Sequence, residues 1–161
     1  MDHIIENITR LENSELFKEW EKGHRGAHLC GVFMMCKVDE VDNGVWQIDF
    51  LLKNRITSFI MENDIKMIDA QELFNKDSKI NELDIKKVKV PLHNAISLAT
   101  KVIKEKYSNE SLEKIIIVLQ NYLWNITYVT SSFSILNFRI STSDGKIIED
   151  KLTPLLNLRS K

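Results

Sequence analysis

The side chains most able to bind a metal gather in one short stretch near the N-terminus: His24, His28, Cys30 and Cys36. Imidazoles and thiolates are ligands that zinc prefers, and on a strand residues 28, 30 and 36 would project from one face. However, residues 30 and 36 would then lie roughly 20 Å apart, too far to share one tetrahedral ion without a sharp bend. These four residues are the candidates for a metal site, but we favour a turn and strand with buried thiols and predict no metal.

No other group of polar residues has a spacing typical of catalysis. His93 lies at an expected helix start, and no serine, cysteine or carboxylate is paired with it as a general base would need. The acidic run Asp39, Glu40 and Asp42 lacks the regular oxygen ligands of a calcium loop. Nucleotide-binding, zinc-protease and nucleophile-elbow motifs are absent. We therefore assign no catalytic residue, predict no cofactor, and favour a non-enzymatic protein.

Composition describes an ordinary globular chain. Its 161 residues predict a single compact domain over residues 1–161. The 22 basic and 23 acidic residues leave a net charge of −1, which offers no general attraction for nucleic acid or an anionic membrane. The N-terminal sequence lacks signal-peptide features, and two cysteines suit a reducing compartment. We expect a cytoplasmic protein with no nucleic-acid or membrane partner.

Hydrophobic periodicity in the first half predicts a helix followed by an antiparallel meander. A helical lead-in precedes a helix over 14–22, which Ser14 or Asn13 would cap and Gly23 would end. Asn43-Gly44 is typical of a type I′ hairpin turn. The three expected strands span 29–38, 45–52 and 56–61. In the linking region, 69–72 fits a capping box that would open a short helix including Leu73 and Phe74, and 88–90 a brief strand.

The second half repeats this order of elements. Apolar residues at helical spacing predict an amphipathic helix from 92 to about 107. Three strands are expected over 114–120, 122–130 and 133–141, followed by a turn at Asp144-Gly145. The final segment, 147–158, has mixed character, and Pro154 fits a position at or near a helix start.

The two halves also share a residue pattern, which indicates an internal duplication. Trp46-x-Ile48-x-Phe50-Leu51 matches Trp124-x-Ile126-x-Tyr128-Val129, 78 residues later, and Ile56, Phe59 and Met61 match Ile135, Phe138 and Ile140, 79 residues later. Shared alternation in any two hairpins is the alternative explanation. We predict an α+β fold of two similar helix-plus-three-stranded antiparallel meander units, about 14–62 and 92–149, joined by 63–91, with the sheet packed against helices.

The second unit resembles a PepSY-type domain, a small helix-and-meander module with a cystatin-like arrangement. The residues that carry the likeness are Asn94–Ala99, similar to the family's Ala-x-x-x-Ala helix, Trp124–Val129, similar to its central strand, and Ile140–Ile148, similar to its closing strand and turn. The likeness covers 92–149, with a possible degenerate copy at 14–62. Ser141 and Ser143 stand where the family usually has Asp and Thr. The resemblance implies a binding or inhibitory module and carries no catalytic residues.

The first strand of each unit, 29–36 and 115–119, is apolar on both faces, which is typical of strands covered on both sides. Either the terminal segments 1–13 and 147–161 supply that cover or a second subunit does, so a homodimer is possible. We expect a protein- or peptide-binding regulatory module that uses its sheet face or edge. The alternative is a small-ligand-binding protein or enzyme whose concave sheet face is lined by Trp46, Trp124 and Tyr128. A pocket of a few hundred cubic ångströms beside these aromatics would favour the alternative, and a filled face the binding module.

Overall fold

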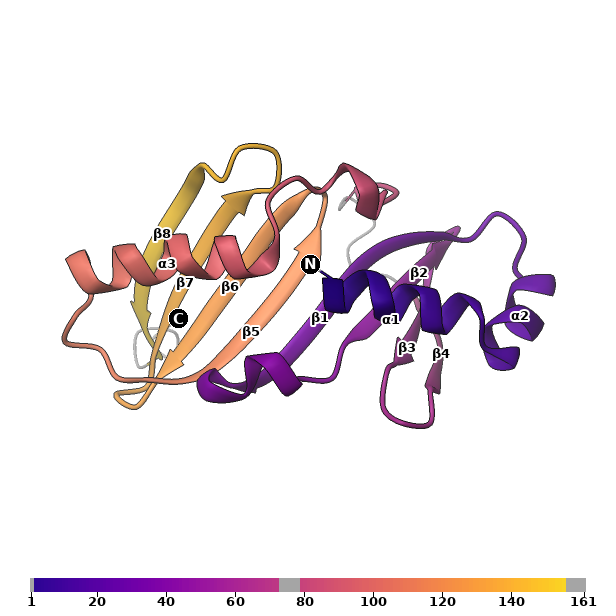
Figure 1. Cartoon of the computed structure of the whole chain (residues 1–161), viewed down its shortest axis with the longest axis horizontal. Coiled ribbons are helices and arrows are strands. Elements are labelled where there is room, and N and C mark those ends of the chain that lie inside the picture. Colours follow the sequence, from indigo (N-terminus) through magenta and orange to yellow (C-terminus); the bar gives the residue numbers. More distant parts are fainter. Residues whose placement is uncertain (1, 73–78, 156–161) are drawn as a thin grey trace.

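A computed structural model describes residues 2–72 and 79–155, and in this range the chain is an α+β protein, as predicted (Figure 1). The helices are α1 (Asp2–Glu12), α2 (Glu15–Lys22), α3 (Leu92–Lys106) and the short 3-10 helices η1 (Val38–Asn43) and η2 (Ile85–Lys87). The strands are β1 (His28–Lys37), β2 (Gln47–Leu52), β3 (Arg55–Ile60), β4 (Lys66–Glu72), β5 (Leu112–Gln120), β6 (Leu123–Thr130), β7 (Ser134–Ser141) and β8 (Ile147–Pro154).

These eight strands form one antiparallel sheet in the order β4-β3-β2-β1-β5-β6-β7-β8. Every neighbouring pair is consecutive in the sequence except β1 and β5, which meet in the middle. Their pairing runs from Gly31 opposite Gln120 to Lys37 opposite Lys114. We call this pairing the seam, because it joins β1–β4 and β5–β8 into a single sheet. Figure 1 shows α1, α2 and α3 on the same face of that sheet.

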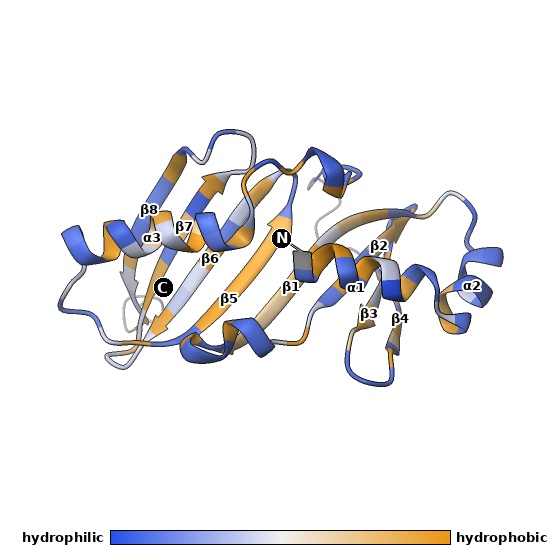
Figure 2. Ribbon diagram, viewed as in Figure 1, coloured by the Kyte–Doolittle hydropathy of each residue, from blue (hydrophilic) through white to orange (hydrophobic). Residues whose placement is uncertain are grey.

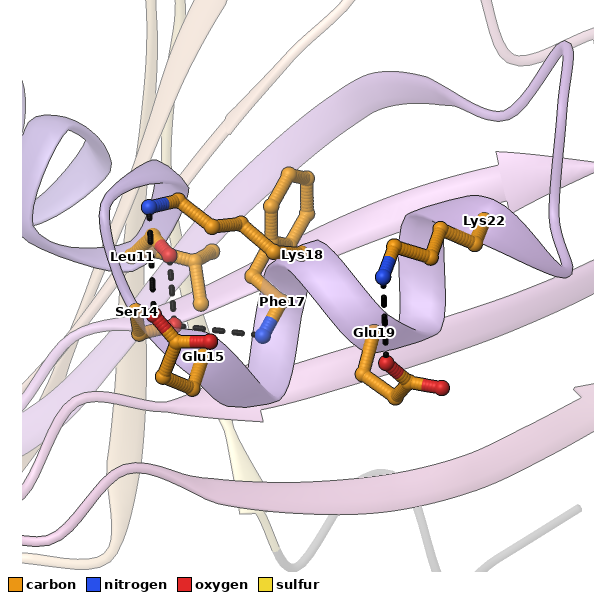
Figure 3. Close-up of polar contacts among 7 residues, drawn as sticks. All are labelled: Leu11, Ser14, Glu15, Phe17, Lys18, Glu19 and Lys22. Carbon is orange, nitrogen blue, oxygen red and sulfur yellow. Dashed lines mark hydrogen bonds and ion pairs between the residues drawn. The ribbon is translucent and has the colours of Figure 1, made fainter.

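Helix α2 begins and ends where the sequence predicts. The Ser14 hydroxyl accepts a hydrogen bond from the Phe17 backbone N–H (3.2 Å) and donates to the Leu11 carbonyl (2.6 Å), as Figure 3 shows. This side chain satisfies one of the free N–H groups at the helix start. Gly23 ends the helix, with its N–H bonded to helix carbonyls. The ion pairs on the outer surface, Lys18–Glu15 and Lys22–Glu19, lie in water and add little stability.

Aromatic side chains fill most of the core between α2 and the first half of the sheet. Phe17 packs against Phe50 with ring centroids 5.1 Å apart, and Trp20 packs edge-on against Phe59 at 5.2 Å. Such tilted and edge-on pairs contribute beyond simple burial. Helix α1 adds a buried aliphatic stripe of Ile4, Ile8 and Leu11.

Small residues let α3 approach the second half of the sheet closely. Ala95 and Ala99 face the strands and are fully buried. Trp124 is also fully buried, and its indole N–H donates to the Val90 carbonyl (2.8 Å) just before α3 begins. Tyr128 and Phe138 pack edge-on with centroids 6.1 Å apart. This half of the core is therefore filled, and its tryptophan is tied to the segment that leads into α3.

Two predictions about the first half are wrong. Asn43-Gly44 forms no type I′ turn: Asn43 ends η1, and Gly44 has φ −66° and ψ 152°, whereas that turn needs positive φ. A Cβ at Gly44 would overlap the end of the Met34 side chain, so this glycine lets η1 and Met34 pack closely without a shift of that side chain. Residues 69–72 belong to β4, which pairs with β3, because pairing along a sheet edge outweighs a local capping pattern. Leu73 and Phe74 lie outside the described residues.

The second half also differs from the prediction in two places. Residues 147–154 form the edge strand β8 rather than a helix start, and Pro154 is its last residue, where a missing N–H costs no ladder bond. Residues 88–90 form no strand, although the N–H groups of Lys89 and Val90 both donate to the Thr142 carbonyl (3.0 and 2.9 Å). Each meander thus gains a fourth strand, β4 or β8, that was not predicted.

Candidate functional site

The four candidate metal ligands lie at different positions between the end of α2 and the end of β1. Cys30 is fully buried in β1, where its thiol donates to the Asp49 carbonyl (3.3 Å) and burial raises its pKa to about 12. Cys36 is half-buried near the other end of β1. His24 stacks on Trp20 at the end of α2, with ring centroids 4.5 Å apart, while His28 is the first residue of β1. Within residues 2–72 and 79–155, no three histidine, cysteine or acidic side chains are grouped to hold a metal ion.

The three aromatic candidates divide into two environments. Trp124 and Tyr128 lie in the core under α3, where burial raises the pKa of Tyr128 to about 12. Neither side chain lines an open face. Trp46 is also buried, with only 4% of its surface exposed, but one side of it borders a cavity. The structure therefore brings Trp46 alone of the three to a site that could hold a ligand.

This cavity lies where α1 and α3 begin, near the middle of the molecule, and the two helices run away from it in opposite directions (Figure 1). Its volume is about 310 Å³, at the lower end of the range for small-molecule pockets. We call it the Trp46 cavity. Its walls combine polar and apolar groups from three segments: His3, Ile4 and Asn7 of α1; Val41, Asp42, Gly44 and Trp46 after β1; and Leu92, His93 and Ile96 of α3.

A second candidate surface is the sheet face opposite the helices. None of the described helices covers it, and neither described terminal segment does, because residues 2–12 form α1 and residues 147–154 form β8. Along the seam this face is apolar: Phe33 lies opposite Val118 and Met35 opposite Ile116. The Met35 side chain is 58% exposed. We call these four residues the seam strip, and Figure 2 shows the hydrophobic character of β5.

Two hydrogen-bonded polar clusters flank the seam strip. On one side Asp49 accepts from Gln47 (3.0 Å) and from the Ser58 hydroxyl (2.6 Å). Desolvation by burial outweighs these two bonds and raises the pKa of the Asp49 carboxyl. On the other side the Asn137 amide donates to the oxygens of Asn125 (2.5 Å) and Thr127 (2.7 Å). We call the sheet face opposite the helices the open face. It has an apolar centre with ordered polar groups on both sides.

Sequence reasoning missed both the polar clusters and the cavity. The sequence pattern is sufficient to find the polar clusters. Gln47 and Asp49 alternate with apolar residues along one strand, and Asn125 and Thr127 do so along another. The sequence indicates His93 only as a helix-start residue, and the structure places it in the cavity wall. No sequence signal joins it to His3 and Trp46, since the three come from segments that meet only in the folded chain.

Comparison with known proteins gives one structural likeness. No family model matches the chain, and no curated protein matches it significantly. A crystal structure from Clostridium difficile 630, described as a "putative lipoprotein", is similar with a TM-score of 0.50 and 11% sequence identity. The match covers 86% of this chain and 90% of that one. At this level of identity the likeness concerns the fold alone. Among the helices in the described part of the chain, none combines the length and apolar character needed to cross a bilayer.

Proposed function

We propose that this chain is a non-enzymatic protein-binding module whose contact surface is the open face of its sheet. The observation that carries the proposal is the seam strip, in which Phe33, Met35, Ile116 and Val118 present apolar side chains on a face that no described helix covers. An antiparallel sheet can leave one face in water, but that face is then normally polar. Directly beside the strip, β2 and β6 follow that rule with Gln47, Asp49, Asn125 and Thr127, and the seam strip departs from it.

The arrangement of groups on this face supports a protein partner. Protein interfaces commonly have an apolar centre that excludes water and a polar rim. Here the Asp49 and Asn137 clusters hold hydrogen-bonding groups in fixed positions on either side of the strip. Side chains that are already ordered lose less conformational entropy on binding. A second copy of this chain is one protein that the surface could accept, which keeps the homodimer as a proposal.

We also propose that the two halves are copies of one unit, for which the strand register is the support. Ile48 lies opposite Phe59 in the first half as Ile126 lies opposite Phe138 in the second. The polar clusters occupy matching places as well. These are the same offsets of 78 and 79 residues seen in the sequence. The PepSY-type likeness is also kept as a proposal. It would favour a binding function over a catalytic one.

A photo-crosslinking residue in place of Met35 tests the binding function. In cells of the source organism we expect a discrete cross-linked adduct, because this side chain stands at the centre of the proposed contact surface. The same residue in place of Leu16, which is 36% exposed on the helix-bearing side, is the matched control and should give none. An adduct of twice the chain's mass would identify the partner as a second copy.

A charge placed in the strip should abolish the adduct. Ile116→Lys puts an ammonium group beside position 35, and burying it without a partner would oppose binding. Ile5→Lys, at an exposed position of α1 on the helix-bearing side of the sheet, adds the same charge away from the contact surface and should leave the adduct intact. Circular dichroism and urea unfolding would verify that both variants fold. Equal cross-linking from positions 35 and 16, or none from either, would contradict the proposal.

A further inference from the structure

We propose that the Trp46 cavity binds a small organic monoanion, a carboxylate with an apolar body. This inference does not depend on the protein-binding function, because the cavity lies among the helices and the seam strip lies on the opposite face of the sheet. It rests on two independent observations: an indole N–H without a partner on the largely buried residue Trp46, and a helix start without a side-chain cap in the same wall.

The hydrogen bonding of Trp46 indicates that its indole N–H faces the cavity. Among the described residues it has no hydrogen-bond partner, although the corresponding group of Trp124 donates to Val90. Yet every fully buried side-chain nitrogen and oxygen in that part of the chain has a partner. The Trp46 N–H must therefore reach solvent. Because only 4% of this residue is exposed and it borders the cavity, the cavity is where the N–H meets solvent. A ligand acceptor there would complete its hydrogen bonding.

The N-terminus of α3 supplies further donors to the same space. Pro91 caps this 15-residue helix without any side-chain hydrogen bond. The first N–H groups bonded back to the Pro91 carbonyl are those of Asn94 and Ala95, which leaves the N–H groups of Leu92 and His93 without a backbone partner. Both residues line the cavity. Free N–H groups together with the positive end of a helix dipole favour an anion.

The rest of the wall narrows the ligand class. Ile4, Ile96 and the Trp46 ring provide an apolar surface that would pack against a hydrocarbon or aromatic body. Asp42 is the one carboxylate in the lining, and it is exposed. Its charge is screened by water but would still oppose a ligand with a second negative charge. A monocarboxylate therefore fits better than a phosphate, and about 310 Å³ suits a body of one ring or a branched chain.

Nuclear magnetic resonance of the indole N–H groups tests this proposal directly, because the chain has only three tryptophans. The probes are phenylacetate, 3-phenylpropionate and 4-phenylbutyrate, each compared with its neutral amide. We expect at least one carboxylate to shift the Trp46 signal saturably, leaving those of Trp20 and Trp124 nearly unchanged. Its amide should bind about tenfold more weakly, since hydrogen bonds to a charged acceptor are the stronger ones.

Two variants test separately the Trp46 N–H and the cavity volume. Trp46→Phe keeps an aromatic ring, removes the N–H, assigns the Trp46 signal by its loss, and should weaken carboxylate binding by about tenfold, measured calorimetrically. Ile96→Phe keeps the N–H but fills the cavity and should abolish binding. Ile5→Phe is the matched control, because this α1 residue is 41% exposed and does not line the cavity. The proposal is overturned if no carboxylate moves the Trp46 signal, if all three signals move alike, or if the amides bind as tightly.

Discussion

Each half of the sheet carries one buried tryptophan near the start of a strand, Trp46 just before β2 and Trp124 in β6, but the surroundings of the two side chains differ. Trp124 lies under a continuous helix, and its N–H is bonded to Val90. Trp46 lies where α1 and α3 begin, next to a cavity of about 310 Å³, and its N–H has no partner among the described residues. One indole therefore serves packing and an internal hydrogen bond, while the other retains a polar group that could recognise a ligand. Similar strands thus do not lead to similar sites.

The number, length and side chains of the helices in each half explain why Trp46 borders a cavity and Trp124 does not. The second half uses one 15-residue helix with alanines at its contact with the sheet, so the helix lies close to the strands and leaves no gap. The first half uses helices of 11 and 8 residues. Its aromatic side chains, such as Phe17 and Trp20, pack over Phe50 and Phe59. This aromatic cluster lies beneath α2, which leaves the space around Trp46 unfilled.

Replacing each tryptophan by alanine should give the largest difference in unfolding free energy between the two halves. Trp124→Ala removes a fully buried ring and is expected to cost about 3–5 kcal/mol of unfolding free energy. Trp46→Ala should cost clearly less, because one side of this ring already faces a cavity and has fewer contacts to lose. Urea unfolding of the three proteins measures both changes. Equal losses at the two positions would end the distinction between a filled half and an open half.

Replacing each tryptophan by phenylalanine keeps an aromatic ring and tests how much each indole N–H contributes to stability. Trp124→Phe leaves the Val90 carbonyl without its donor and should cost about 1–3 kcal/mol. Trp46→Phe removes an N–H that has no protein partner, so we expect a loss under about 1 kcal/mol. Hydrogen exchange of the indole groups gives a second measure: Trp124 should be protected and Trp46 should exchange quickly. A protected Trp46 would contradict the orientation of its N–H toward the cavity.

The smallest effect concerns the polar clusters on the open face and depends on pH. Burial raises the pKa of Asp49 in the folded protein, so the folded state holds its proton more tightly than the unfolded state does. Wild-type stability relative to Asp49→Asn should therefore be highest below about pH 4 and fall as pH rises through the folded-state pKa. Thr127, at the matching place in the other half, does not ionise as Asp49 does. Thr127→Asn should give a difference from wild type that does not vary with pH in this range. The test is a set of urea titrations between about pH 4 and pH 7.

The sequence was most informative where a local pattern and the tertiary structure agree. The Ser14 cap, the Gly23 stop and the alternation around Trp46 and Trp124 specify α2, β2 and β6 because each depends on neighbours within a few residues. The prediction failed where a distant strand decides the outcome. Residues 69–72 have a helix-start pattern, but β3 offers an unpaired edge and the segment joins it.

The candidate site could be predicted only in part. The sequence indicates Trp46 as a residue that could line a ligand site, but it does not indicate the residues that surround Trp46 in the fold. The cavity depends on how the start of α1 meets the start of α3, residues about 90 positions apart, and on Gly44 allowing η1 to pack against Met34. No periodicity encodes a gap between two helices, because a gap is set by side-chain volumes from separate segments.

The seam has a consequence for how quickly the chain acquires its structure. Every other strand pair closes a short local loop, while β1 and β5 pair residues about 80 positions apart. Contacts between distant residues carry a larger loop-closure entropy and form more slowly. We therefore expect each meander to assemble first and the central pairing to follow. Until it does, two apolar strand edges are unprotected on every nascent molecule, so refolding yield should fall as protein concentration rises.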